Sequence, residues 1–289
     1  MEERTAKSIK AVKIGIAGNV MLALFKVLLG IFAHSIALIS DGIDTSIDVA
    51  KSFIVYKGIK IAAEPPDSAH PYGHGRAETI ASNLIGTSVI FAGILIIVES
   101  LLTFGKTNAV DILMLTGAGT SIVGKIILST YMSRVGKKFS NQALLADAKD
   151  YLGDVLASSA VVIGSILIMA TGKKYFDSIA SIAVAIIISY MGLKVLQPGF
   201  QEIMEEQNNP EITKKIEDIV KKFSKPVNPH LIRMRRLGSY YIVDMHLEFP
   251  GSMTIEESHM IVSTIEKEIK TEIPEVQDIT IHIEPIGNG

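Results

Sequence analysis

Six long apolar runs occupy most of the first two thirds of the chain, and they constrain the fold more than any other feature. A helix that spans a bilayer needs about 20 predominantly apolar residues, and its backbone groups must be satisfied internally. Each run is that long. We therefore expect an α-helical membrane protein with six transmembrane helices, near residues 12–33, 36–62, 79–102, 110–132, 143–170 and 176–197.

The C-terminal residues have the mixed composition of a soluble domain. A helical period begins at Pro210, and apolar and polar residues alternate along YYIVDMHLEF from Tyr240 and DITIHIEP from Asp278. Thr254 and Glu257 have the spacing of a capping box at the start of another helix. We expect the order helix, strand, strand, helix, strand in a small α/β domain of ferredoxin-like type. The predicted domains are residues 1–205 and 206–289.

Lysine and arginine positions predict the orientation of the membrane helices. Ten of these residues lie in or next to the N-terminal segment, the join between spans two and three, and the join between spans four and five, whereas the opposite loops hold three. We therefore expect both termini and the C-terminal domain to be cytoplasmic, in an integral protein of the inner or plasma membrane. The net charge of −2 gives no general attraction to nucleic acid.

Carboxylates stand inside two of the apolar runs, where an ionised side chain costs about 2.5–3.5 kcal/mol on insertion scales. Each run carries three of them at the spacing i, i+3, i+7: Asp41, Asp44 and Asp48 in the second run, and Asp147, Asp150 and Asp154 in the fifth. This spacing keeps three side chains within about 60° of one helix face. Two such faces that meet would form one carboxylate-lined site.

Carboxylates packed in a medium of low dielectric repel one another, and either protons or a divalent cation relieve the repulsion. Oxygen ligands suit Mn²⁺, Mg²⁺ and Ca²⁺ and tolerate Zn²⁺ and Fe²⁺, whereas a thiolate site is excluded because the chain has no cysteine. A site that exchanges protons for a cation has the chemistry of an antiporter. In the alternative interpretation, the aspartates pair with membrane lysines, namely Lys26, Lys51 and Lys125. That alternative, or a helix-terminal role, fits Asp41 and Asp147 better than the other four.

Three stretches resemble the cation diffusion facilitator family of divalent-metal/proton antiporters: SIALISDGIDTSIDVAKS from Ser35, PDSAHPYGHGRAE from Pro66 and ADAKDYLGDVLAS from Ala146. The resemblance covers essentially the whole chain. It implies an intramembrane transport site at Asp44, Asp48, Asp150 and Asp154. Members that carry zinc or cadmium typically have a histidine at the position of Asp150 or Asp44. The all-aspartate site here resembles the manganese-type members, and loss of imidazole favours a harder ion.

The same resemblance implies two further metal sites, which involve six of the seven histidines. The family's loop site corresponds to Asp67, His70 and His74. Its cytoplasmic centre, which is binuclear in members that have it and lies near the dimer contact, corresponds to His230, His246, His259, His282 and Glu284. The alternative is a solvated loop and ordinary polar-face histidines. The seventh histidine, His34, is expected at the membrane interface. Relatives also pair a basic with an acidic residue near the dimer interface, which implies Arg76 with Glu205.

These features lead us to expect a homodimeric exporter of divalent cations that exchanges metal for protons, with Mn²⁺ favoured and Zn²⁺, Fe²⁺, Co²⁺ and Cd²⁺ possible. Divalent ions would be both transported and regulatory, and the C-terminal domain would bind metal and dimerise. One alternative is a non-transporting metal sensor or scaffold in the membrane. Another is a passive channel, which needs weak binding at several sites. An enzyme is not expected, because neither a phosphate-binding glycine loop nor a nucleophile–base pair is present.

Overall fold

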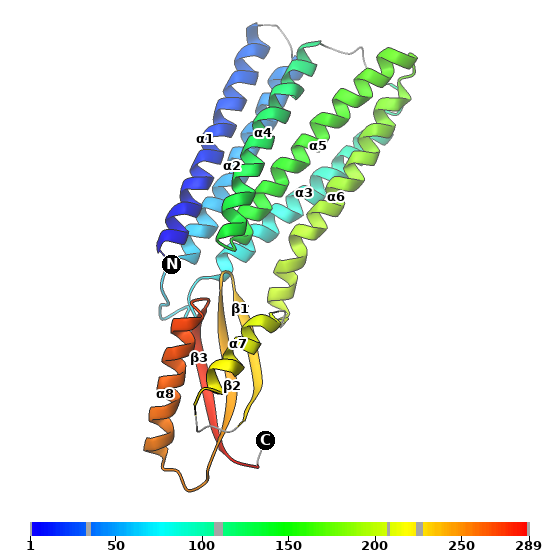
Figure 1. The fold of residues 1–289 in the computed structure, drawn as a ribbon. Coiled ribbons are helices and arrows are strands. Elements are labelled where there is room, and N and C mark those ends of the chain that lie inside the picture. Colours follow the sequence, from blue (N-terminus) through cyan, green and yellow to red (C-terminus); the bar gives the residue numbers. More distant parts are fainter. Residues whose placement is uncertain (1, 33–35, 107–111, 207–208, 224–227, 288–289) are drawn as a thin grey trace. The chain divides into compact units, whose positions relative to one another are not determined.

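The computed structural model describes residues 2–32, 36–106, 112–206, 209–223 and 228–287 (Figure 1). Within these residues the chain starts with six long helices: α1 Glu2–Phe32, α2 Ile36–Ala62, α3 Arg76–Leu102, α4 Ile112–Lys138, α5 Gln142–Thr171 and α6 Tyr175–Ile203. The chain divides into two compact units, Met1–Gly199 and Phe200–Gly289. The six helices of the first unit run alongside one another, as the sequence predicts for a transmembrane bundle.

Four of these helices, α1, α3, α5 and α6, are long and apolar enough by composition to cross a membrane. Helix α2 carries three aspartates and three lysines, and α4 contains Lys125 among many small polar residues. Such helices must turn their polar side chains toward protein or water rather than lipid. Large apolar side chains such as Phe25, Phe91 and Ile127 are exposed on the outside of the bundle. The outer surface is therefore suited to lipid, and the polar groups gather between helices.

Helix α1 begins ten residues before the predicted span, and Arg4 in its first turn finds partners inside the bundle. The Arg4 guanidinium donates two hydrogen bonds, of 2.8 and 2.7 Å, to the carboxylate of Glu78 on α3. Its Nε donates a third, of 3.0 Å, to the carbonyl of Phe139. Glu78 is buried. The sequence prediction counted only apolar residues and so missed this polar extension of the helix.

Small residues allow helices α2 and α3 to approach closely. A Cβ atom on Gly58 would lie 2.5 Å from the Cβ of Ala81 and 3.0 Å from the carbonyl oxygen of Ala77. Close packing of small residues is the main way in which helices associate in lipid, where hydrophobic burial gives no driving force. Helix α3 in turn packs on α5, and α1 packs on α2. This packing holds α2 and α5, which carry the aspartates, in one bundle.

The second unit contains α7 Pro210–Val220, β1 Pro229–Leu237, β2 Tyr240–Phe249, α8 Ile255–Glu272 and β3 Val276–Pro285. The predicted order of helices and strands is confirmed. The sheet order is β1-β2-β3, with β1 antiparallel and β3 parallel to β2. Parallel pairing of β2 and β3 is possible because α8 forms the crossover between them. The capping box at Thr254 and Glu257 is also confirmed.

Both helices of this unit cover one face of the sheet. Ile216 of α7, Met245 of β2 and Ile265 of α8 are fully buried in one apolar cluster. Alternation along β2 places His246 on the opposite face. The N–H of Gly238, in the turn between β1 and β2, donates a 2.9 Å hydrogen bond to Glu202 near the end of α6. The sheet therefore has one face closed by helices and one polar face that carries histidine.

The close approach of α2 and α3 predicts that Gly58→Leu destabilises the bundle by about 1–3 kcal/mol, the usual cost of overpacking. The measurement is thermal unfolding of the purified protein in detergent. Gly119→Leu is the matched control, because a Cβ at this helical glycine meets nothing within 4 Å. Equal effects of the two substitutions would contradict the packing argument.

Candidate metal sites

Helices α2 and α5 bring three of the four predicted membrane ligands together. Asp48 of α2 and Asp150 and Asp154 of α5 each offer a carboxylate oxygen, and these oxygens all lie within 4.8 Å of one another. Asp48 and Asp150 are buried, and Asp154 is half-buried. Asp150 and Asp154 are four residues apart and so share one face of α5. We call Asp48, Asp150 and Asp154 the carboxylate cluster.

Two lysines lie directly on the carboxylate cluster. Lys51 Nζ is 2.7 Å from Asp48 and 2.8 Å from Asp150. Lys125 of α4 bridges Asp48 and Asp154, because its Nζ lies 2.6 Å from each carboxylate. The pairing with membrane lysines that the sequence left as an alternative is therefore present in this structure. It leaves three carboxylates facing two ammonium groups.

The other three membrane aspartates lie outside the carboxylate cluster. Asp44, the fourth predicted ligand, has an exposed side chain and is not brought to the other three. Asp41 forms a 2.9 Å ion pair with the buried Lys26, whose Nζ also donates a 3.0 Å hydrogen bond to Thr45. Asp41 thus pairs with a membrane lysine, which is one of the two roles that the sequence favoured for it.

Asp147 lies in a buried polar network that the sequence analysis missed. It is fully buried, and the Ser52 hydroxyl donates to its carboxylate at 3.3 Å. Ser52 also lies 2.9 Å from the Tyr151 hydroxyl, which accepts a 3.1 Å hydrogen bond from Asn19 of α1. The available signal was Asn19 itself, an amide in the middle of an apolar run. The network ties α1, α2 and α5 together beside the carboxylate cluster.

The loop between α2 and α3 brings its three predicted ligands together. One ligand atom each from Asp67, His70 and His74 lies within 4.8 Å of the others. Asp67 lies 3.3 Å from His70 Nδ1 and 3.4 Å from His74 Nε2. The backbone N–H groups of His70 and Ala69 hydrogen-bond to the Asp67 carboxylate and hold its pKa below the usual range. Asp67 therefore stays ionised, as a metal ligand must.

The C-terminal sheet places three histidines in a row across its polar face. His230 of β1 pairs in register with His246 of β2, which pairs with His282 of β3. The ring centroids of His246 and His282 are 4.7 Å apart. Glu284 Oε1 lies 2.6 Å from His230 Nε2 and 3.3 Å from His246 Nδ1. His230, His246 and Glu284 thus converge, with His282 beside them.

The donor chemistry of this row suits a metal ion. His230 Nε2 is buried and lacks the alignment of a hydrogen bond despite its short distance to Glu284. Imidazole nitrogen and carboxylate oxygen together are a common ligand set for Zn²⁺ and accept Mn²⁺. His259 lies apart from this group, exposed on the first turns of α8. Its assignment as a ligand stays a prediction.

Arg76 and Glu205 do not belong to the three groups of possible metal ligands found among the described residues. Arg76 begins α3 and is exposed, and Glu205 follows α6 with a positive φ of 55°. The two belong to different units, so their pairing stays a prediction. His34 lies outside the described residues.

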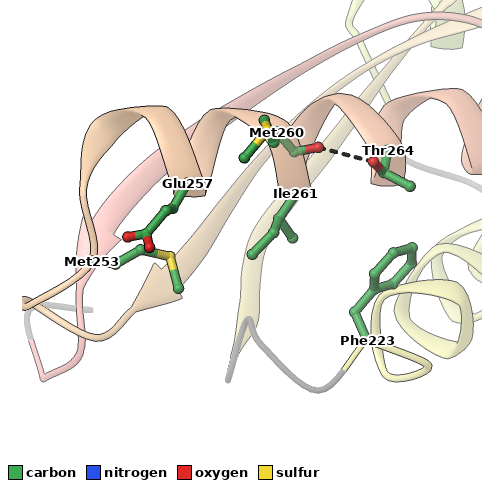
Figure 2. A pocket seen from close by; sticks show the side chains of 6 residues that line it. All are labelled: Phe223, Met253, Glu257, Met260, Ile261 and Thr264. Atoms are coloured by element: carbon green, nitrogen blue, oxygen red, sulfur yellow. Dashed lines mark hydrogen bonds between the residues drawn. The ribbon is translucent and has the colours of Figure 1, made fainter.

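A pocket of about 360 Å³ lies along α8 (Figure 2). Its lining is mostly apolar: Phe223, Met253, Met260 and Ile261, with Glu257 and Thr264. The carboxylate of Glu257 already accepts hydrogen bonds from the backbone and hydroxyl of Thr254 in the capping box. The lining contains no histidine and no free carboxylate, so this pocket is not a candidate metal site.

Comparison with known proteins gives two matches to protein families. The family of cation efflux transmembrane domains matches residues 12–204. The family of cation efflux protein cytoplasmic domains matches residues 209–286.

Two relatives match nearly the whole chain. The manganese efflux system protein MneP of Bacillus subtilis (strain 168) is 32% identical over 290 residues, which cover 98% of this chain and 98% of that protein. An uncharacterised transporter of Methanocaldococcus jannaschii is also 32% identical, over 95% of this chain and 97% of its own length. Among solved structures, the metal-bound C-terminal domain of the CzcD transporter from Thermotoga maritima is 31% identical. The match covers 29% of this chain and 96% of the CzcD domain, with a TM-score of 0.28.

Proposed function

This chain belongs to the cation diffusion facilitator family of cation efflux proteins, and from that premise we propose that it exports a divalent cation in exchange for protons. The family is one of membrane transporters, and the coarser function, efflux of metal cations, follows from membership. The observation that carries the finer proposal is the carboxylate cluster between α2 and α5. Carboxylates are the side chains that exchange a bound cation for protons most directly.

Manganese is the proposed cargo. Asp44, Asp48, Asp150 and Asp154 supply only oxygen ligands, and Mn²⁺ completes its shell readily with water or backbone oxygen. Zn²⁺ gains more from imidazole in a tetrahedral site. The relative MneP of B. subtilis is named as a manganese efflux protein, which agrees with this choice. Asp44 is included as a ligand that joins the other three when an ion binds.

The transport cycle follows from competition at one site that opens alternately to each side of the membrane. Metal that enters from the cytoplasm displaces protons from the aspartates, and protons from outside displace the metal. The membrane potential contributes about 2.3 kcal/mol per 100 mV for each net charge moved. A passive channel fits less well, because three carboxylates whose oxygens lie within 4.8 Å of one another form one compact site rather than several weak ones. A sensor without transport fits less well because it has no need of a membrane site.

The remaining proposals concern domains, further metal sites and assembly. We assign residues 1–205 as a transmembrane domain and residues 206–289 as a cytoplasmic domain. In this assignment both termini are cytoplasmic. The histidine row and Glu284 bind regulatory metal, His259 completes that centre, and the loop ligands Asp67, His70 and His74 form a third site. Two copies of the chain form a dimer, with Arg76 and Glu205 at the interface.

Transport is tested in vesicles with an imposed proton gradient. When the vesicle interior is the more acidic side, the wild type should take up Mn²⁺ as protons leave, because protons and metal compete for the same carboxylates. Asp48→Asn and Asp154→Asn should each reduce uptake to background, and Asp44→Asn should impair it. Glu99→Gln, at an exposed carboxylate of α3 outside the cluster, is the control that should retain uptake. Undiminished flux in both cluster variants would show that the site is elsewhere.

The C-terminal site is tested with full-length protein in which Asp48→Asn and Asp154→Asn silence the membrane cluster. Calorimetry should detect divalent ions that bind this protein, and a His246→Ala, His282→Ala double substitution should remove a distinct set of sites. Transport by these histidine variants in the otherwise intact chain should be impaired but not lost, because the site is regulatory. Glu275→Gln, an exposed acidic residue outside the row, is the control. Identical titrations before and after the histidine substitutions would refute the assignment.

Metal choice is tested at position 150. Asp150→His replaces an oxygen ligand by imidazole, so uptake should shift toward Zn²⁺ and Cd²⁺ and away from Mn²⁺. Only the neutral imidazole binds metal, so uptake by this variant should rise steeply as the pH increases through about 6.5. Asp150→Asn is the control, because it removes the charge without adding nitrogen. A wild type that already prefers Zn²⁺ over Mn²⁺ in direct competition would contradict the argument from ligand hardness.

A further inference from the structure

The carboxylate cluster and its two lysines form one chain of alternating charge. Asp154 contacts Lys125, Lys125 contacts Asp48, Asp48 contacts Lys51 and Lys51 contacts Asp150, with every ion pair between 2.6 and 2.8 Å. Three helices contribute, since Lys125 comes from α4, Asp48 and Lys51 from α2, and Asp150 and Asp154 from α5. The ammonium groups therefore lie where positive charge is needed between the converging carboxylates.

These ion pairs use the same oxygen atoms that a divalent cation requires. Asp48 is engaged on both sides, with Oδ1 facing Lys51 and Oδ2 facing Lys125. Both oxygens of Asp150 accept hydrogen bonds from Lys51. A cation that binds Asp48 together with Asp150 or Asp154 must therefore break at least one existing pair. Lysine is suited to such exchange, because its ammonium group is a point charge on a flexible four-carbon stem.

We propose that Lys51 and Lys125 are displaceable counter-ions of the transport site, which hold its carboxylates together when no divalent ion is bound and move aside when one binds. This inference rests on the proposed transport function and assigns to it two residues that are not metal ligands. Without the lysines, three neighbouring carboxylates would repel one another in the empty site. With them, each divalent ion competes against cations that belong to the protein as well as against protons, so the affinity for the ion is lowered and its release is made easier.

Charge balance agrees with this role. The four proposed aspartate ligands carry four negative charges when ionised, and the two lysines carry two positive charges. The displaced ammonium groups stay beside the aspartates, and the remaining two negative charges then match those of one divalent cation, so the site with its ion and both lysines is neutral within the membrane. A neutral assembly avoids the large cost of a net charge in a medium of low dielectric. A monovalent ion would leave the site charged.

The test compares three side chains at each lysine position. Methionine keeps the length and apolar stem of lysine but has no charge. Arginine keeps the charge, and its planar guanidinium group forms two hydrogen bonds with a carboxylate. It should therefore compete more strongly than lysine with a divalent ion. Displacement therefore predicts that the Kd for Mn²⁺ increases in the order Met, Lys, Arg, with about a tenfold gain in affinity for Lys125→Met or Lys51→Met, which corresponds to ~1.4 kcal/mol.

Binding is measured by calorimetry on the full-length protein, in a parent that carries His74→Ala, His246→Ala and His282→Ala, so that titration reports the membrane site. Uptake in vesicles provides the second measurement. In the lysine-to-methionine variants both KM and kcat for Mn²⁺ should fall, since the ion binds more tightly and leaves more slowly. Lys149→Met removes a lysine of α5 that hydrogen-bonds to the Lys194 carbonyl on α6, and its Kd and KM should equal those of the parent.

Each alternative outcome has a distinct meaning. Equal Kd values for lysine and arginine would show that only the charge matters, and would overturn displacement. Methionine variants that lose activity with unchanged Kd would show a purely structural role, and so would also overturn it. If Lys125→Met does not fold, the arginine variants and Lys51→Met decide the question. A parent that binds no Mn²⁺ in an Asp48-dependent manner would instead refute the proposed function, and the role of the lysines with it.

Discussion

Ionised carboxylates between membrane helices require partners, and this requirement determines how the first unit is arranged. Removal of one partner from a buried ion pair costs about 3–5 kcal/mol, because the other charge stays behind uncompensated. Asp48, Asp150 and Asp154 meet this requirement through lysines of α2 and α4. Helix α4, which carries no predicted ligand, is thus bound to the site by electrostatics. The polar interior and the apolar exterior of the bundle are two results of the same constraint.

The two units satisfy their polar groups by different physical means. In the bundle, aspartates depend on long basic side chains that reach across helices, as with Lys125. In the C-terminal sheet, strand pairing alone brings His230, His246 and His282 into one row. The first arrangement can be rearranged by moving side chains, which suits the proposed transport site. The second is fixed by backbone hydrogen bonds, which suits the proposed regulatory site.

Much of this architecture was predictable from the sequence, because it depends on periodicity. Apolar runs predicted the six helices, alternation predicted β2 and β3, and Thr254 with Glu257 predicted the start of α8. Contacts between distant side chains were less accessible. The pairing of Arg4 with Glu78, and that of Asn19 with Tyr151, depends on which helices touch and at which height, and no local pattern specifies that. For the same reason Asp44 and Asp48 looked equivalent in the sequence, although only Asp48 reaches the cluster.

The histidine row depends on strand register, and this makes the turn after α8 a sensitive part of the protein. Side chains alternate between the two faces of a strand, so a slip of one residue exchanges all of them. Removal of a single residue between Glu272 and Val276 would therefore turn His282 and Glu284 toward the face that α7 and α8 cover. Point substitutions in this turn leave the register intact, whereas length changes do not. This turn should therefore tolerate changes of residue type better than changes of length.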